Sequence, residues 1–168
     1  MDMLITGMHG SGNVGLNGCT DQQYLQHFAM WSFLGSPLIM GADLRKIDKT
    51  NKDILLNKGL IAINQDEEYR PAFLVDNMGD KRYILAKLLS GNRIALAFFN
   101  LEYESDYLNT MEISFCDIGI HSGTGIKMKF INAVTGESIG VYQDAFSAQV
   151  LPDECKIIVA EMILPEKE

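Results

Sequence analysis

Apolar residues recur at intervals of three or four between positions 20 and 34, which is the period of an amphipathic helix. Thr20, followed three residues later by Gln23, has the capping-box pattern that starts a helix. The apolar surface of this helix is broad, so we expect it to be buried on more than one side. Gly35-Ser36-Pro37 follows and is expected to end the helix.

The next segments alternate between strand and helix patterns. Residues 38–42, Leu-Ile-Met-Gly-Ala, form an unbroken apolar run that is typical of a strand buried on both faces. A second helix is expected after Asp48 or Thr50, either of which can cap it, and Gly59 is expected to stop it. Residues 60–64 are interpreted as a turn of helix returning to the sheet. This order of elements indicates a parallel α/β layer.

From Arg70 the apolar period changes to two, which predicts antiparallel β-structure. Residues 83–88 and 93–99 flank the turn sequence Ser90-Gly91-Asn92 and are expected to form a hairpin. Further strands are predicted at residues 111–115, 126–131, 138–142, 145–150 and 155–160, and residues 161–168 are expected to form a frayed, charged tail. This spacing indicates an antiparallel sandwich or a small barrel. We therefore divide the chain into an α/β part, residues 1–66, and an all-β part, residues 67–168.

The net charge, the apolar runs and the cysteine spacing argue against several classes of binding partner. The chain has 168 residues and a formal net charge of −8 that is spread along its length, which argues against binding to nucleic acid or to an anionic membrane. No apolar run approaches the ~20 residues that span a bilayer. Its three cysteines lie far apart, with no CxxC and no Cys/His spacing of a zinc site, so we expect reduced thiols, no metal and no cofactor. With no Asn-x-Ser/Thr sequon either, the sequence predicts a cytoplasmic protein.

Several residues were weighed as candidates for chemistry. Residues 10–15 match GxGxxG, but a dinucleotide site needs a helix that opens at the glycines, and the predicted helix starts only at Thr20, so we interpret the segment as a loop. His27 has no partner at metal spacing and is interpreted as a polar-face or satisfied buried histidine. Asp43 follows the predicted strand, where α/β folds place functional groups, although we prefer a solvated or loop-capping carboxylate.

The residues by themselves do not define a reaction. No Ser-His-Asp, Cys-His or HExxH arrangement is recognisable. The acidic runs at residues 66–68 and 102–104 are interpreted as solvated surface. Tyr103 and Tyr107 offer an edge on which a sugar could stack, or they are ordinary surface tyrosines.

Four blocks occur in order within residues 1–66. They are Asp2-Met3-Leu4 leading to Gly7, then Tyr24 and Phe28 with Trp31, then residues 36–45 (Ser-Pro-Leu-Ile-Met-Gly-Ala-Asp-Leu-Arg), then residues 61–66 (Ile-Ala-Ile-Asn-Gln-Asp). In combination they resemble the late part of the α-galactosidases of glycoside hydrolase family 27. The resemblance implies an α/β remnant of a (β/α)8 barrel, made of its last helices and strand, followed by an antiparallel β-sandwich domain. It also implies that Asp2 and Met3 line a galactose pocket.

The sequence departs from this family in one important respect. Family members cleave with retention, using two aspartates from earlier strands, and such a pair stands about 5–5.5 Å apart. Neither aspartate lies in this chain, so no catalytic residue is assigned. We expect a C-terminal piece of an α-galactosidase-like protein, inactive alone, that meets α-galactoside sugar only when the rest of the barrel is supplied.

Two further expectations concern partners. A barrel remnant exposes strand edges and apolar faces, so we expect it to pack against the β domain or to self-associate with a second copy of the chain. The alternative to the glycosidase reading is a non-catalytic carbohydrate-binding or assembly module built on the β-sandwich.

Overall fold

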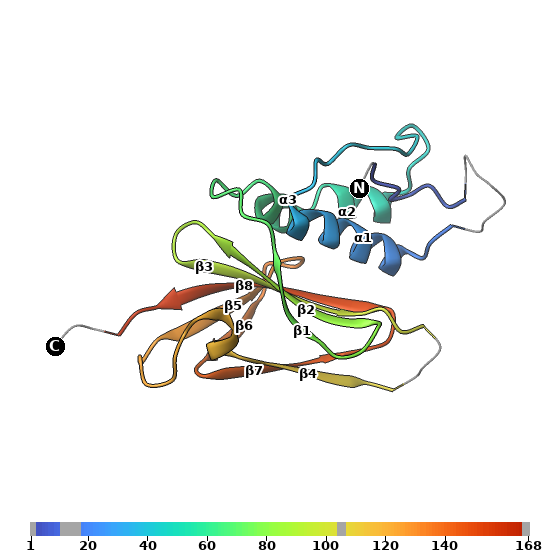
Figure 1. Cartoon of the computed structure of the whole chain (residues 1–168). Helices are drawn as coiled ribbons and strands as arrows, with labels where there is room; N and C mark the ends of the chain where they lie inside the picture. Colours follow the sequence, from blue (N-terminus) through green and yellow to red (C-terminus); the bar gives the residue numbers. More distant parts are fainter. Residues whose placement is uncertain (1–2, 11–17, 104–106, 166–168) are drawn as a thin grey trace.

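The computed structural model describes residues 3–10, 18–103 and 107–165, which fold into stacked layers (Figure 1). Three helices, α1 (Asp21–Leu34), α2 (Lys49–Leu55) and α3 (Lys58–Asn64), lie over one face of a six-stranded antiparallel sheet with the order β1-β2-β3-β8-β5-β6. A two-stranded sheet, β4-β7, covers the opposite face. The strands are β1 (Phe73–Asn77), β2 (Arg82–Leu89), β3 (Arg93–Asn100), β4 (Asn109–Ser114), β5 (Lys127–Asn132), β6 (Ser138–Tyr142), β7 (Ala145–Val150) and β8 (Glu154–Ile163).

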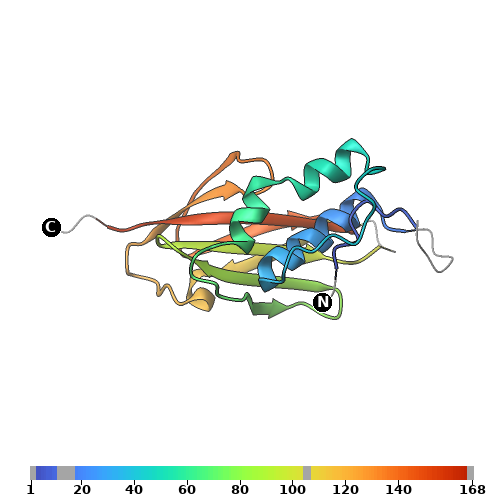
Figure 2. The same ribbon diagram turned by 90° about the horizontal axis from the view of Figure 1, so that it is seen from above.

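The six-stranded sheet is buried on both faces at its centre. On β3, Leu96 and Phe98 point into a hydrophobic cluster shared with β4 and β7, whereas Ala97 and Phe99 belong to a second cluster shared with the helices. Seen from above, α1 crosses the central strands (Figure 2). The helices therefore pack against the β part, as we expected, and the predicted antiparallel sheets and hairpin are confirmed.

Helix α1 forms as its sequence predicts. The Thr20 hydroxyl accepts the Gln23 N–H at 3.1 Å, and the Gln23 side chain accepts the Thr20 N–H at 3.1 Å. Gly35 ends the helix in the left-handed region, with φ of 66°. The capping box and the glycine stop are local interactions, which is why sequence alone located this helix.

Two predicted boundaries are wrong, and one strand was not predicted. Gly59 does not stop a helix: α2 ends at Leu55, Asn57 accepts the N–H of Leu60 at 3.0 Å, and α3 begins with Gly59 in its first turn. Strand β1 was not predicted, because this edge strand is mostly exposed and shows no alternation. Residues 161–163 are not frayed, since β8 continues to Ile163, which pairs with Lys127 on β5.

The predicted strand at residues 38–42 is reduced to one parallel bridge between Leu4 and Met40. The Leu4 N–H donates to the Ile39 carbonyl at 2.7 Å, and the Gly41 N–H donates to the Leu4 carbonyl at 2.8 Å. Burial on both faces is wrong for this segment, because Ile39 is 54% exposed. The helices cover one face, and no other described element covers the second.

Candidate functional site

The segment that leads into the helices, residues 3–10, is attached to α1 by two side chains. Nε2 of His27 accepts the Ile5 N–H at 3.3 Å, and the Tyr24 hydroxyl accepts the His9 N–H at 2.7 Å. Burial lowers the pKa of His27, which keeps the ring neutral and able to accept. The interpretation of His27 as a satisfied histidine is confirmed, and its role is to hold the segment that carries Met3.

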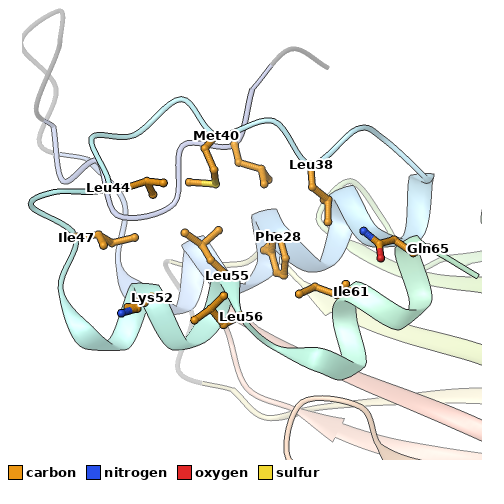
Figure 3. Close-up of a pocket in the computed structure, with 11 residues that line it drawn as sticks. Phe28, Leu38, Met40, Leu44, Ile47, Lys52, Leu55, Leu56, Ile61 and Gln65 are labelled. Atoms are coloured by element: carbon orange, nitrogen blue, oxygen red, sulfur yellow. The ribbon is translucent and has the colours of Figure 1, made fainter.

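Side chains alternate along the two bridged segments. Leu38 and Met40 point toward the helices (Figure 3), and Leu4 is buried in a cluster with Phe28 and Leu60 of the helices. The side chains between them, Met3, Ile5 and Ile39, are 46%, 38% and 54% exposed. We call these three residues the open apolar face. Two adjacent parallel segments thus have one face packed on helices and the other uncovered by any described residue.

A cavity of about 460 Å³ lies between these segments and the helices (Figure 3). Leu38, Met40 and Leu44 line one side, and side chains of the helices line the other. The lining from the helices is Phe28, Lys52, Leu55, Leu56, Ile61 and Gln65, with Leu4 and Ile47 completing it. Because nearly all of these groups are apolar, the cavity suits packing of hydrophobic side chains rather than catalysis.

Of the two predicted sugar-site residues, Asp2 lies outside the described residues and Met3 lies on the open apolar face. Met3 is adjacent to Gly41, where an added Cβ would fall 3.1 Å from the Met3 Cβ. Met3 therefore lies against the bridged part of residues 38–42. Most of the GxGxxG segment, residues 11–15, also lies outside the described residues.

Asp43 has the loop-capping role that we preferred. Its Oδ1 accepts the backbone N–H of Arg45 at 3.1 Å and the Arg45 Nε–H at 2.9 Å, while Oδ2 accepts from Nη2 at 2.9 Å. The Arg45 guanidinium lowers the pKa of the Asp43 carboxyl. The Asp43 carboxylate is therefore ionised and paired with the Arg45 guanidinium.

The interpretation of residues 66–68 as solvated is wrong for Asp66, which is buried. Its carboxylate accepts from the backbone N–H and the hydroxyl of Ser90, each at 2.9 Å, and from the Glu68 N–H at 3.1 Å. Burial opposes ionisation, but these hydrogen bonds outweigh it and the pKa of Asp66 is lowered. Asp66 therefore joins the end of the helical part to the β2–β3 turn.

The two candidate stacking tyrosines are on the surface of the β part. Tyr103 is 66% exposed and Tyr107 is 81% exposed. The Lys81 ammonium lies 4.5 Å from the centroid of the Tyr103 ring and covers one of its faces. A sugar could stack only on the remaining face of Tyr103.

Sequence reasoning missed one polar cluster, formed by His9, Asp21, Asp48 and Asn51. These residues come from three separate segments of the chain and meet because α1 and α2 pack side by side next to residues 3–10. No spacing rule could have found them.

None of the helices in the part of the chain that the structure describes has the length and apolar character needed to cross a bilayer. The cytoplasmic location expected from the sequence stays a prediction.

Comparison with known proteins finds similarity to α-galactosidases. Residues 1–66 match the family described as alpha galactosidase A. The α-galactosidase of Cyamopsis tetragonoloba is 30% identical over 146 residues, which cover 87% of this chain and 34% of that protein. Alpha-galactosidase A of Cellvibrio japonicus is 35% identical over 107 residues, covering 64% of this chain and 24% of that protein.

Solved structures of α-galactosidases have a fold similar to that of this chain. Alpha-galactosidase I from Mortierella vinacea has a TM-score of 0.75 at 25% identity, over 88% of this chain and 37% of that one. The α-galactosidase of Saccharomyces cerevisiae, solved with raffinose, has a TM-score of 0.78 at 17% identity, over 96% of this chain and 46% of that one, and shows likeness of fold alone. This chain spans about a third of the length of the curated relatives.

Proposed function

We propose that this chain, as a member of glycoside hydrolase family 27, is the C-terminal part of an α-galactosidase-like retaining glycosidase. The enzyme would act on terminal α-galactosyl groups. The observation that carries the proposal is the pair of parallel segments bridged at Leu4 and Met40, with helices on one face and the open apolar face on the other. Strands of a (β/α)8 barrel alternate in this way between the outer helices and the barrel interior.

The elements take their barrel positions from the family resemblance. Asp2 and Met3 belong to the loop after the seventh strand, α1 is the seventh helix, residues 38–42 are the eighth strand, and α2 with α3 closes the ring. The barrel part then covers residues 1–66 and the β-sandwich residues 67–168. The position of Met3 beside Gly41 supports a place for Asp2 and Met3 in the sugar pocket.

Catalysis needs groups from the rest of the barrel. A retaining mechanism requires a nucleophile and an acid/base about 5–5.5 Å apart. The resemblance assigns both aspartates to earlier strands, outside these 168 residues. A chain with a pocket-lining carboxylate and no nucleophile forms no glycosyl-enzyme intermediate, so we expect no hydrolysis by the chain alone.

Hydrolysis of an aryl α-galactoside tests this proposal. The purified chain and its Asp2→Ala variant should both show no turnover. Co-expression with the earlier barrel segment of a relative should restore turnover, which Asp2→Ala should reduce strongly. Asp53→Ala is the matched control, since Asp53 is an exposed partner of Lys49 on α2. Turnover by the chain alone that Asp2→Ala abolishes would refute the assignment, as would a folded two-part complex without activity.

The alternative, a non-catalytic carbohydrate-binding or assembly module, is favoured only by the exposure of Tyr103 and Tyr107. Titration of galactose into the isolated chain, followed by NMR, distinguishes the two functions. Saturable binding that Tyr103→Ala or Tyr107→Ala removes would support the binding module. If the isolated chain shows no such binding, the result favours the glycosidase assignment.

A further inference from the structure

The segment that carries Met3 is held by hydrogen bonds on both of its edges. On one edge, the N–H and the carbonyl of Leu4 bond to the backbone of residues 38–42, at 2.7 and 2.8 Å. On the other edge, the Ile5 N–H donates to Nε2 of His27 on α1 at 3.3 Å. Successive backbone N–H groups of an extended segment point in opposite directions, so the two contacts do not compete. The backbone that follows Met3 is thus fixed between residues 38–42 and α1.

His27 can hold Ile5 only while its ring is neutral. A neutral imidazole has one nitrogen that accepts and one that carries a proton, whereas both nitrogens of the protonated ring are donors. Because Nε2 accepts the Ile5 N–H, the proton of the neutral ring lies on Nδ1. The His27 ring lies 4.1 Å from the Trp31 ring, measured between centroids, and burial lowers the pKa of His27. Protonation would place one donor against another and break the contact with Ile5.

The titratable groups of the adjacent segments are engaged elsewhere. Residues 38–42 contain no titratable side chain. In residues 3–10 the titratable side chain is His9, whose Nε2 lies 2.9 Å from Asp48 Oδ2. The Asp48 carboxylate therefore pairs with His9, and burial is the cause of the lowered pKa of His27. None of these groups offers a negative charge that would stabilise a proton on His27.

We propose that His27 is a positioning residue of the sugar pocket: its neutral ring holds the segment that carries Met3, and protonation of the ring releases this segment and weakens binding of an α-galactoside. The inference rests on the proposed function, which places Asp2 and Met3 in the pocket. Ile5 is two residues from Met3, so a shift of the Ile5 backbone also displaces the pocket side chains. His27 acts through the segment that it holds and does not itself contact the sugar.

Tyr24 offers a comparison, because it holds the same segment farther from Met3. Its hydroxyl accepts the His9 N–H at 2.7 Å, and Tyr24 is 1% exposed. Loss of this short, buried hydrogen bond should destabilise the fold more than loss of the longer contact with His27. His9 lies six residues after Met3, so sugar binding should depend less on Tyr24. The two side chains therefore distinguish a structural role from a positioning role.

Hydrolysis of an aryl α-galactoside by this chain in complex with the earlier barrel segment of a relative tests the proposal. His27→Leu, which has no acceptor, should raise KM about fivefold at neutral pH and leave kcat nearly unchanged. His27→Gln keeps a side-chain acceptor and should have a KM near that of the wild type. Below pH 6.5, the ordinary pKa of histidine, the wild-type KM should rise relative to that of His27→Gln, because glutamine does not titrate. Taking the ratio of the two KM values at each pH cancels the titration of the catalytic groups.

Two further variants serve as controls. Tyr24→Phe should lower the melting temperature and leave KM close to the wild-type value. His121→Gln removes an exposed histidine of the β part and should change neither quantity. The proposal is overturned if His27→Leu keeps the wild-type KM, if Tyr24→Phe raises KM as much as His27→Leu does, or if His27→Gln and the wild type share one pH dependence. The melting temperature of each variant shows that it is folded.

NMR of the isolated chain tests the contact without the catalytic complex. The ring nitrogen shifts of His27 at neutral pH should show a proton on Nδ1 and none on Nε2, and the Ile5 amide signal should shift as His27 is protonated. A proton on Nε2, or an Ile5 signal that does not follow the titration of His27, would overturn the proposal. An inactive wild-type complex would instead refute the proposed function, whereas an active complex with unchanged KM in His27→Leu would refute this inference alone.

Discussion

The ammonium of Lys87 donates a hydrogen bond of 3.2 Å to the carbonyl of Ser32, which joins the six-stranded sheet to the last turn of α1. Lys87 is 1% exposed and Ser32 is fully buried. A cation near the C-terminus of a helix interacts favourably with the helix dipole. Burial nevertheless lowers the pKa of Lys87, against the attraction of the Asp66 charge. The hydrogen bond between Lys87 and Ser32 is specific, but burial of the Lys87 charge destabilises the folded state.

Lys87→Met should therefore leave the free energy of unfolding near pH 7 unchanged or raise it by about 1 kcal/mol. The lowered pKa of Lys87 means that the folded state binds fewer protons than the unfolded state as the pH rises toward the ordinary value of 10.5. Wild-type stability should rise in that window, and the variant should lack the rise. Urea unfolding between neutral and alkaline pH measures both effects.

Lys129→Met is the control, because Lys129 pairs with Glu161 on the exposed surface and should not alter the alkaline rise. A loss of more than about 2 kcal/mol in Lys87→Met at neutral pH would show that the hydrogen bond to Ser32 outweighs the cost of burial.

Gly59 is required by the contact between α3 and the loop at Ala133. A Cβ at position 59 would lie 1.8 Å from the Ala133 carbonyl oxygen, a backbone atom that cannot move alone. Gly59→Ala should thus destabilise the chain by about 2 kcal/mol or more, although alanine normally favours a helix by about 1 kcal/mol. Gly35→Ala is the matched control, since Gly35 needs its left-handed conformation but has no atom within 4 Å of the added Cβ.

Thermal and urea unfolding compare the two glycine variants. Gly35→Ala should cost about 1 kcal/mol, which is the penalty of the left-handed conformation alone. Equal losses in both variants would mean that α3 and the Ala133 loop separate easily, and the close approach would then have no energetic role.

These examples show which parts of the fold the sequence determines locally. Helix α1 was predictable because the Thr20 cap and the apolar period lie within the helix itself. Strands β6 and β7 coincide with the predicted residues 138–142 and 145–150 because alternation and turn residues delimit them. The role of Gly59 was not predictable, since the atom that excludes a side chain there belongs to Ala133, far away in the sequence.

Only part of the candidate site was predictable from the sequence. The family resemblance pointed to Asp2 and Met3, and the structure places Met3 beside Gly41. The cluster around Asn51 was not predictable from the sequence because its side chains come from three segments that meet only after the helices pack. Burial of Asp66 was missed for a similar reason, because its partner Ser90 lies in the hairpin turn.

Asp66→Asn should destabilise the chain by about 2 kcal/mol at neutral pH, because the carboxylate accepts charge-assisted hydrogen bonds from Ser90. The pKa of Asp66 is lowered in the folded state, so its contribution is complete above the ordinary value of 3.8 and is lost as the pH falls through the folded value. Acid unfolding followed by circular dichroism should show a shallower loss of stability in the variant. Glu67→Gln, an exposed neighbour, should behave like the wild type.

The open apolar face predicts how the isolated chain behaves in solution. Met3, Ile5 and Ile39 are exposed apolar side chains on two adjacent segments, and such surfaces associate in water. We expect the isolated chain to form dimers or larger species, measurable by analytical ultracentrifugation. Ile39→Lys should shift the equilibrium toward monomer, because it places a charge at the centre of the face.

The substitution should leave stability almost unchanged, since Ile39 is 54% exposed. Leu164→Lys is the control for added charge: Leu164 is 59% exposed and follows β8, near the opposite end of the chain. If Leu164→Lys dissociated the oligomer and Ile39→Lys did not, association would involve the β part, and the open apolar face would not be the interface. A monomeric wild type would show that this face remains soluble by itself, which would also weaken its assignment as a surface that the rest of a barrel covers.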